Sequence, residues 1–84
     1  MPTLSRFHGI VIRMYYQQAE HNPPHVHAFC GGYIAVVAIH TGTLIEGYLP
    51  PKALVMVRKW IGMNKSDLLD IWETQSFKTL PPLE

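Results

Sequence analysis

The sequence predicts an α+β fold, in which an antiparallel β-meander of about four strands packs against one long kinked or two short C-terminal helices. Segments rich in β-branched and aromatic residues, separated by glycine turns, fill residues 9–49. A proline pair, Pro50-Pro51, ends this region, and apolar residues then recur at helical spacing to about residue 75. A sheet face and a helix stripe each need a partner in order to be buried, so the two layers pack together.

Four segments have the composition of strands: residues 9–16, 25–30, 33–40 and 43–49. Pro23-Pro24 keeps the chain extended before the second segment, because a proline restricts the residue that precedes it. Gly31-Gly32 is a two-residue hairpin signal, since tight hairpin turns require positive φ. Thr41-Gly42 is a second turn of similar kind. These turns favour a simple meander.

The two turns also predict which residues lie opposite one another. If Gly31-Gly32 forms the first turn, the expected pairs are Cys30 with Tyr33, His27 with Val36, and His25 with Ala38. If Thr41-Gly42 forms a two-residue turn as well, the expected pairs are Val37 with Glu46 and Ala38 with Ile45. This register places Glu46 on the sheet face opposite to that of the two histidines.

The helical region has a clear start and an open question in its middle. Pro51 suits the first turn of a helix, where its missing N–H costs nothing. Gly62 costs about 1 kcal/mol relative to alanine within a helix. Asn64 or Ser66 suits the cap of a new helix, with Asp67 favourable in its first turn. One kinked helix and two short helices are both compatible, and residues 77–80 are a candidate edge strand.

The composition indicates a single small domain that needs a partner surface. We expect one domain over residues 1–84, with the sheet in 5–49, helices in 51–75 and an extended tail in 76–84. Hydrophobic residues make up 48% of the chain and charged residues 15%, against about 25% charged in an average domain. Apolar surface therefore remains after folding, and such patches mark interfaces. A homo-oligomer or a dedicated protein partner is expected.

Charge and cysteine content further limit the kind of ligand and the cellular location that we expect. The net charge of +1 gives little of the basic footprint that nucleic-acid binding requires. A single cysteine, Cys30, forms no internal disulfide. The N-terminal apolar run is interrupted by Arg13 and resembles neither a signal peptide nor a membrane span. A cytoplasmic protein without membrane association is expected.

The densest chemistry lies in EHNPPHVHAFCGGY, residues 20–33, which holds three of the five histidines. His25 and His27 are two residues apart, so on a strand their imidazoles share one face. A bend at the prolines brings His21 towards them. His21, His25 and His27 are thus candidate catalytic residues, because histidine has an unperturbed pKa of about 6.5 and transfers protons near neutral pH. Arg13 is a candidate phosphate contact of the same site.

The same three histidines are candidate ligands for a divalent metal such as Zn or Mn. With Glu46 expected on the opposite face, no carboxylate of the predicted sheet completes a site. Further ligands would have to come from a second subunit or from elsewhere in the chain: His40, Asp67, Asp70 or Glu73. Structural histidines that bond backbone or water are the simpler interpretation.

Four stretches of the chain carry a family resemblance: MPTLSRFHGIVIRMYY, HNPPHVHAFCGGY, TGTLIEGYLP and VRKWIGMNKSDLLDIW. Together they resemble the DUF4160 family of small prokaryotic proteins, to about residue 73. The most specific segment is H-x-P-P-H-x-H, which matches this sequence position by position at His21, Pro23, Pro24, His25 and His27. This chain has AFCGGY where the family pattern has an acidic or polar residue before the glycines, which removes one carboxylate ligand.

The resemblance implies a genetic partner. Genes of this family often lie beside a second small gene of the DUF2442 class, in an arrangement like a toxin–antitoxin pair. We therefore expect a small cytoplasmic binding protein that acts as one half of such a pair. The alternative is a histidine-dependent or metal-assisted phosphodiesterase, an RNase-like toxin. A weak nucleic-acid-binding regulator is the second alternative, which the near-zero charge disfavours.

Overall fold

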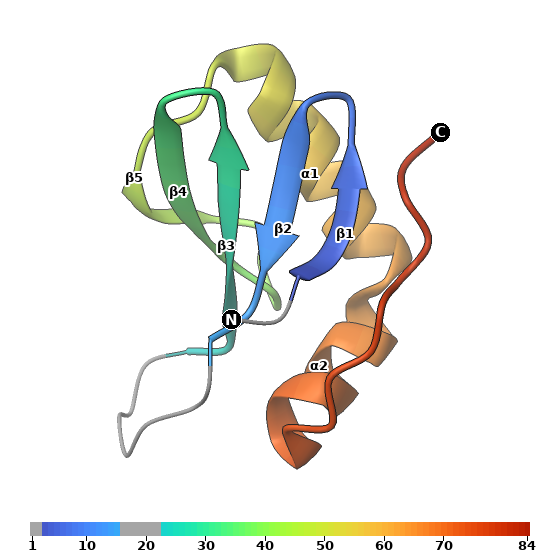
Figure 1. The fold of residues 1–84 in the computed structure, drawn as a ribbon. Coiled ribbons are helices and arrows are strands. Elements are labelled where there is room, and N and C mark those ends of the chain that lie inside the picture. Colours follow the sequence, from blue (N-terminus) through green and yellow to red (C-terminus); the bar gives the residue numbers. More distant parts are fainter. Residues whose placement is uncertain (1–2, 16–22) are drawn as a thin grey trace.

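Among residues 3–15 and 23–84, which the computed structural model describes, five antiparallel strands form one sheet in the order β1-β2-β3-β4-β5 (Figure 1). The strands are β1 (Thr3–Phe7), β2 (Ile10–Arg13), β3 (His25–Cys30), β4 (Tyr33–Ala38) and β5 (Leu44–Gly47). Two helices follow, α1 (Pro51–Met63) and α2 (Lys65–Thr74). The α+β fold class is confirmed, and the meander has one strand more than the four expected.

The additional strand is β1, which is joined to β2 by a tight turn at His8 and Gly9. Phe7 pairs with Ile10 across this turn. His8 has φ 49° and Gly9 has φ 77°, and positive φ at both central residues suits the twist of a two-residue hairpin. Gly9, which directly precedes the apolar run of β2, is a sequence signal for this turn. Histidine at the first turn position obscured it, because residues other than glycine seldom adopt positive φ.

The helical region divides at Asn64, so the two-helix alternative is the one that the chain adopts. Gly62 stays within α1, and Pro51 occupies its first position. Asn64 precedes α2, yet its side chain donates to the carbonyl oxygen of Trp60 at 2.9 Å and gives α2 no side-chain cap. Neither helix is long and apolar enough to cross a membrane, nor is any other in the described part of the chain.

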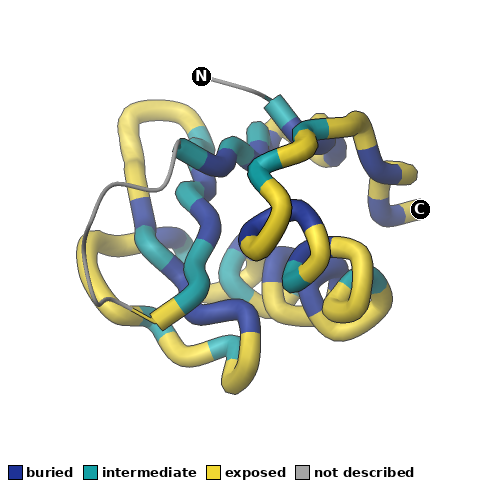
Figure 2. The backbone as a smooth tube through the Cα atoms, turned by 90° about the horizontal axis from the view of Figure 1, so that it is seen from below, coloured by how far each residue is buried: buried dark blue, intermediate teal, exposed yellow. Residues whose placement is uncertain are grey.

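One face of the sheet packs on the two helices and forms the core. In Figure 2, buried residues alternate with less buried ones along the strands, as expected when one sheet face is covered. The sheet contributes Ile10, Ile12, Val26, Ala28, Ala35 and Val37, and the helices contribute Val57, Trp60, Ile61, Leu68, Ile71 and Trp72. The helix stripe predicted from the sequence is thus the buried one. The helices leave the described part of the opposite sheet face uncovered except at the start of β3, where Trp72 of α2 approaches His25.

The C-terminal segment, residues 75–84, runs beside β1 (Figure 1). The Leu80 N–H donates to the Leu4 carbonyl oxygen at 2.7 Å, and the Trp60 indole Nε1–H donates to the Pro81 carbonyl oxygen at 2.8 Å. Leu80 and Leu83 are buried in the core. The extended tail was predicted correctly, but residues 77–80 form no strand.

The predicted register is right for β3 and β4 and wrong for β4 and β5. His25 pairs with Ala38 and His27 with Val36, as expected. Glu46, however, pairs with Val36 instead of Val37, because the register shifts between these two valines. The connection between β4 and β5 is residues 39–43, not a two-residue turn. A slip of one residue moves a side chain to the other face of a sheet.

Side chains from the helices hold this longer connection in place. The Arg58 Nε–H donates to the Gly42 carbonyl oxygen at 2.8 Å, and the Lys65 ammonium donates to the His40 carbonyl oxygen at 2.8 Å. Within the connection, the Gly42 N–H donates to the Ala38 carbonyl oxygen at 3.0 Å. These bonds stabilise a connection of five residues, where the sequence pattern predicts a turn of two, and the register of β5 differs accordingly.

Candidate functional site

The sheet face that the helices leave uncovered carries both histidines of β3, and we call it the histidine face. Strand alternation and register assign to it Arg6, Val11, Arg13, His25, His27, Phe29, Ile34, Val36 and Glu46. Its residues on β2 and β3 are half-buried, whereas the other face of these strands carries the buried residues Ile10, Ile12, Val26 and Ala28. One row crosses four strands, with Arg13 opposite His27, His27 opposite Val36 and Val36 opposite Glu46.

Glu46 is therefore on the same face as the histidines, which corrects the expectation that it lies on the opposite one. Val36 separates it from His27 by one strand. The expectation failed because it depended on a two-residue turn at Thr41-Gly42. With the register that the chain adopts, the histidine face has an acidic end on β5 and a basic member, Arg13, on β2.

His25 is held at the start of β3 with one ring nitrogen occupied. Its Nδ1 lies 2.9 Å from the carbonyl oxygen of Pro23. A carbonyl oxygen only accepts, so Nδ1 carries the proton and the neutral ring keeps its lone pair at Nε2. The ring centroid is 5.4 Å from that of His27 and 5.0 Å from that of Trp72 on α2. In this tautomer, Nε2 is the nitrogen of His25 that can act as a base or as a metal ligand.

His27 packs deeper in the face. Its ring meets Tyr15 edge-on with centroids 4.2 Å apart. Burial lowers the pKa of His27 below its usual 6.5, the neighbouring His25 lowers it further, and Glu46 acts in the opposite direction. Burial and a neighbouring imidazolium both disfavour the charged ring. Nδ1 of His27 is buried and has no hydrogen-bond partner among the described residues.

Arg13 stands directly opposite His27 on β2. Its guanidinium carbon lies 5.2 Å from the ring centroid of Phe29, within the range of a cation–π contact. Its Nε is buried, and within residues 3–15 and 23–84 it has no hydrogen-bond partner. Arg13 forms no ion pair with Glu46. Among the described residues, Lys78 and Asp67 form an ion pair. The structure thus brings together Arg13, His25 and His27.

The predicted metal site depends on a residue outside the described part of the chain. His21 lies in residues 16–22, which the structure does not describe. In the part that it does describe, no three His, Cys, Asp or Glu side chains form a group able to hold a metal ion. His25 and His27 supply two ring nitrogens, while a zinc site takes three or four protein ligands. The Zn or Mn site remains a prediction that requires His21 or a second subunit.

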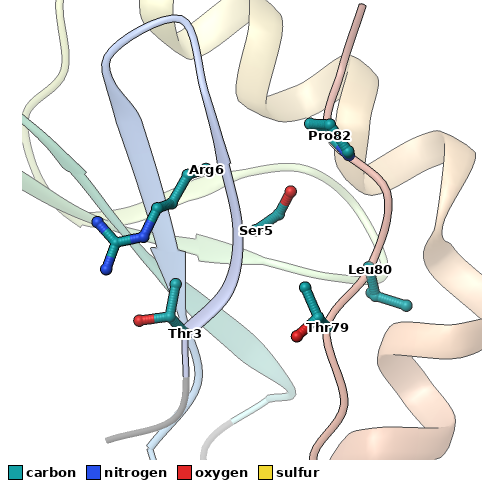
Figure 3. A pocket seen from close by; sticks show the side chains of 6 residues that line it. All are labelled: Thr3, Ser5, Arg6, Thr79, Leu80 and Pro82. Carbon is teal, nitrogen blue, oxygen red and sulfur yellow. The ribbon is translucent and has the colours of Figure 1, made fainter.

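A separate pocket lies between β1 and the C-terminal segment (Figure 3). It measures about 350 Å³ and is lined by Thr3, Ser5, Arg6, Thr79, Leu80 and Pro82. Ser5 is only 3% exposed, and its hydroxyl finds no hydrogen-bond partner among the described residues. The hydroxyl points into the gap between the two segments (Figure 3). Sequence reasoning missed this pocket because it depends on how the tail folds back.

Comparison with known proteins gives one match. A family model described as a domain of unknown function, DUF4160, matches residues 9–73. No curated protein and no solved structure matches this chain. The matched region spans β2 to most of α2 and includes Arg13, His25 and His27.

Proposed function

This chain belongs to the DUF4160 family, and we propose that it is a small cytoplasmic binding protein that forms one half of a two-gene, toxin–antitoxin-like pair. The partner we propose is the small DUF2442-like protein encoded beside it, docked on the histidine face. The observation that carries this proposal is the face itself: a sheet surface with apolar, aromatic and charged side chains, whose described residues the helices touch only at His25, beside Trp72.

Apolar side chains cluster at one end of this surface. Ile34 is 53% exposed and pairs with Phe29 across β3 and β4. Tyr48, whose N–H bonds to the Ile34 carbonyl oxygen, is also 53% exposed. Its ring centroid lies 5.2 Å from that of Tyr33, which strand alternation assigns to the other face of β4. Exposed clusters of this kind mark protein interfaces, and tyrosine is enriched in interface centres. This end of the face supports an apolar contact with a partner.

Charges in the neighbouring row of side chains on this face supply orientation. Arg13 lies on β2 and Glu46 on β5, at opposite ends of one row across the sheet. A partner with an acidic group facing Arg13 and a basic group facing Glu46 docks in one orientation only, because the reversed complex places like charges together. Apolar contact and charge pattern together fit a dedicated partner.

Light scattering coupled to size-exclusion chromatography tests the proposal, on the chain alone and mixed with the neighbour-encoded protein. We expect a complex of defined mass that elutes before either component. A chain that remains unchanged on mixing with its neighbour contradicts the proposal. A homodimer that also ignores the neighbour contradicts it too, and assigns the surface to self-association.

A second candidate function is histidine-dependent cleavage of a phosphodiester, as in an RNase-like toxin. The observation that favours it is the pairing of His25, whose neutral ring carries its lone pair at Nε2, with His27 at a ring separation of 5.4 Å. General acid–base catalysis needs two such groups near the reacting phosphate. A metal-assisted version requires His21 as well.

Expression in a bacterial host separates the two candidates. If the chain is a histidine-dependent enzyme, growth inhibition by the wild type is lost in the His25→Ala/His27→Ala double variant. Equal inhibition by both chains removes catalysis by this pair. The remaining alternative, a weak nucleic-acid-binding regulator, predicts an affinity that falls steeply with salt.

A further inference from the structure

We propose that Arg13, His25 and His27 form a binding site for a single phosphate group that has an O–H donor beside it. The inference goes beyond the proposed pairing, because it assigns a small anionic ligand to one part of the histidine face. Its starting point is a pair of buried polar atoms left without partners on residues that stand directly opposite each other.

The two atoms are Nε of Arg13 and Nδ1 of His27. Both are buried, and neither has a hydrogen-bond partner among the described residues. Nearly all buried polar atoms in folded proteins have one, so an exception needs an explanation. Directly opposite residues in an antiparallel pair have Cβ atoms about 5 Å apart. The two unpartnered atoms therefore belong to neighbouring side chains, and a single small ligand is the simplest partner for both.

The site calls for an acceptor ligand of negative charge. An arginine Nε–H only donates, and guanidinium remains charged at all ordinary pH values. Glu46 does not fill this role, since Val36 separates it from His27 by one strand. The Phe29 ring lies against the Arg13 guanidinium and fixes the direction in which its donors point. A guanidinium group whose N–H donors are held in one direction suits the oxygens of a phosphate or a carboxylate.

His25 selects phosphate over carboxylate. Its Nδ1–H is engaged by the Pro23 carbonyl oxygen, which leaves a lone pair at Nε2 in the neutral ring. A ligand that presents an O–H beside its charged oxygens can donate to that lone pair, whereas a ligand without one leaves it to water. A carboxylate near neutral pH has none, because carboxyl groups have pKa values of about 4. Inorganic phosphate carries its own O–H, and a ribonucleotide phosphodiester has the neighbouring 2′-hydroxyl.

Nuclear magnetic resonance titration of the full chain tests this site with three probes: inorganic phosphate, a ribodinucleoside monophosphate and its 2′-deoxy counterpart. We expect the Arg13 Nε–H and His27 ring signals to shift and saturate together. Binding of inorganic phosphate alone identifies free phosphate as the source. Tighter binding of the ribodinucleotide than of the deoxy form identifies RNA.

Two variants and one control decide the outcome. Arg13→Lys keeps the charge but removes the Nε–H, and should weaken phosphate binding about tenfold, the usual effect of losing a hydrogen bond to a charged group. His27→Phe keeps the ring beside Tyr15 and should weaken it comparably. The control is Arg58→Lys, because the Nε of Arg58 is already bonded to Gly42. Equal weakening by Arg13→Lys and Arg58→Lys overturns the inference.

Failure of this inference is distinguishable from failure of the proposed function. A chain that binds the neighbour-encoded protein but gives no saturable shift at Arg13 with any of the three probes overturns the phosphate site alone. A chain that binds phosphate at Arg13 but ignores its neighbour overturns the proposed pairing and leaves the phosphate site standing.

Discussion

Glu46 lies on the same face of the sheet as His27, one strand removed from it across Val36. The two side chains interact, because Glu46 favours the charged form of the His27 ring against the effects of burial and of His25. A carboxylate on β5 therefore tunes an imidazole on β3, and the relationship exists only because the register shifts between β4 and β5.

Removing this carboxylate should lower the pKa of His27 further. In Glu46→Gln, burial and His25 still disfavour the protonated ring, and the opposing influence of Glu46 is lost. Titration of the His27 ring signals by nuclear magnetic resonance measures the change. The control is Glu73→Gln on α2, which should leave His27 as it is. A His27 pKa that stays constant or rises in Glu46→Gln contradicts the register described above.

The lowered pKa of His27 makes the stability of the chain depend on pH. The folded pKa lies below the usual 6.5, so the unfolded chain binds a proton at a higher pH than the folded chain does. The contribution of His27 is thus lost as the pH falls from about 6.5 towards the folded pKa. The free energy of unfolding should fall more steeply in the wild type than in His27→Phe over this range.

Urea denaturation at several pH values measures this difference, with His40→Gln as the control. His40 is exposed in the β4–β5 connection, so its replacement should preserve the pH dependence. Parallel curves for the wild type and His27→Phe would show that His27 titrates alike in the folded and unfolded chains.

Gly47 is required by the register of β5. Its φ is 83°, and a Cβ at this position would overlap the carbonyl oxygen of Ile34. Gly47→Ala should therefore lower the free energy of unfolding by about 3 kcal/mol, from backbone strain and the clash. Gly62→Ala is the matched control, because a Cβ there meets no atom within 4 Å and alanine favours a helix interior by about 1 kcal/mol. Equal effects of the two substitutions in thermal unfolding would contradict the close approach at Gly47.

The Trp60 indole anchors the C-terminal segment through its bond to Pro81. Trp60→Phe keeps most of the buried ring but loses this donor, and should cost about 1 kcal/mol. We expect faster amide hydrogen exchange at Leu80, whose N–H bonds to Leu4. Exchange at Ile39, whose N–H bonds to Pro24 just beyond the paired ends of β3 and β4, serves as the internal control. Unchanged exchange at Leu80 would mean that the tail is held without the indole.

Local signals predicted the β3–β4 hairpin well, because Gly31-Gly32 sets that register by itself and strand periodicity then places His25 and His27 on one face. The β4–β5 register was out of reach. The connection between these strands is bonded by two helix side chains that are distant in sequence. Arg58 bonds to Gly42, 16 positions earlier in the chain, and Lys65 bonds to His40, 25 positions earlier. No pattern along the chain reveals such contacts.

The candidate site, like the β4–β5 register, could be predicted from the sequence only in part. Arg13 was a candidate on charge alone, but its place opposite His27 depends on the β2–β3 register, and no short turn signal connects those strands. The approach of Trp72 to His25 depends on how α2 packs beside the sheet. Sequence periodicity identifies faces, whereas tertiary packing decides which faces and strand ends meet.

The central claim is that the histidine face, and not the helix surface, contacts the partner. Calorimetric titration of the neighbour-encoded protein into Ile34→Asp and Val55→Asp tests it most directly, because both residues are exposed apolar side chains, at 53% and 63%, on opposite layers of the fold. We predict that Ile34→Asp weakens binding at least about tenfold and that Val55→Asp binds like the wild type. Weakening by Val55→Asp with normal binding by Ile34→Asp would contradict the claim.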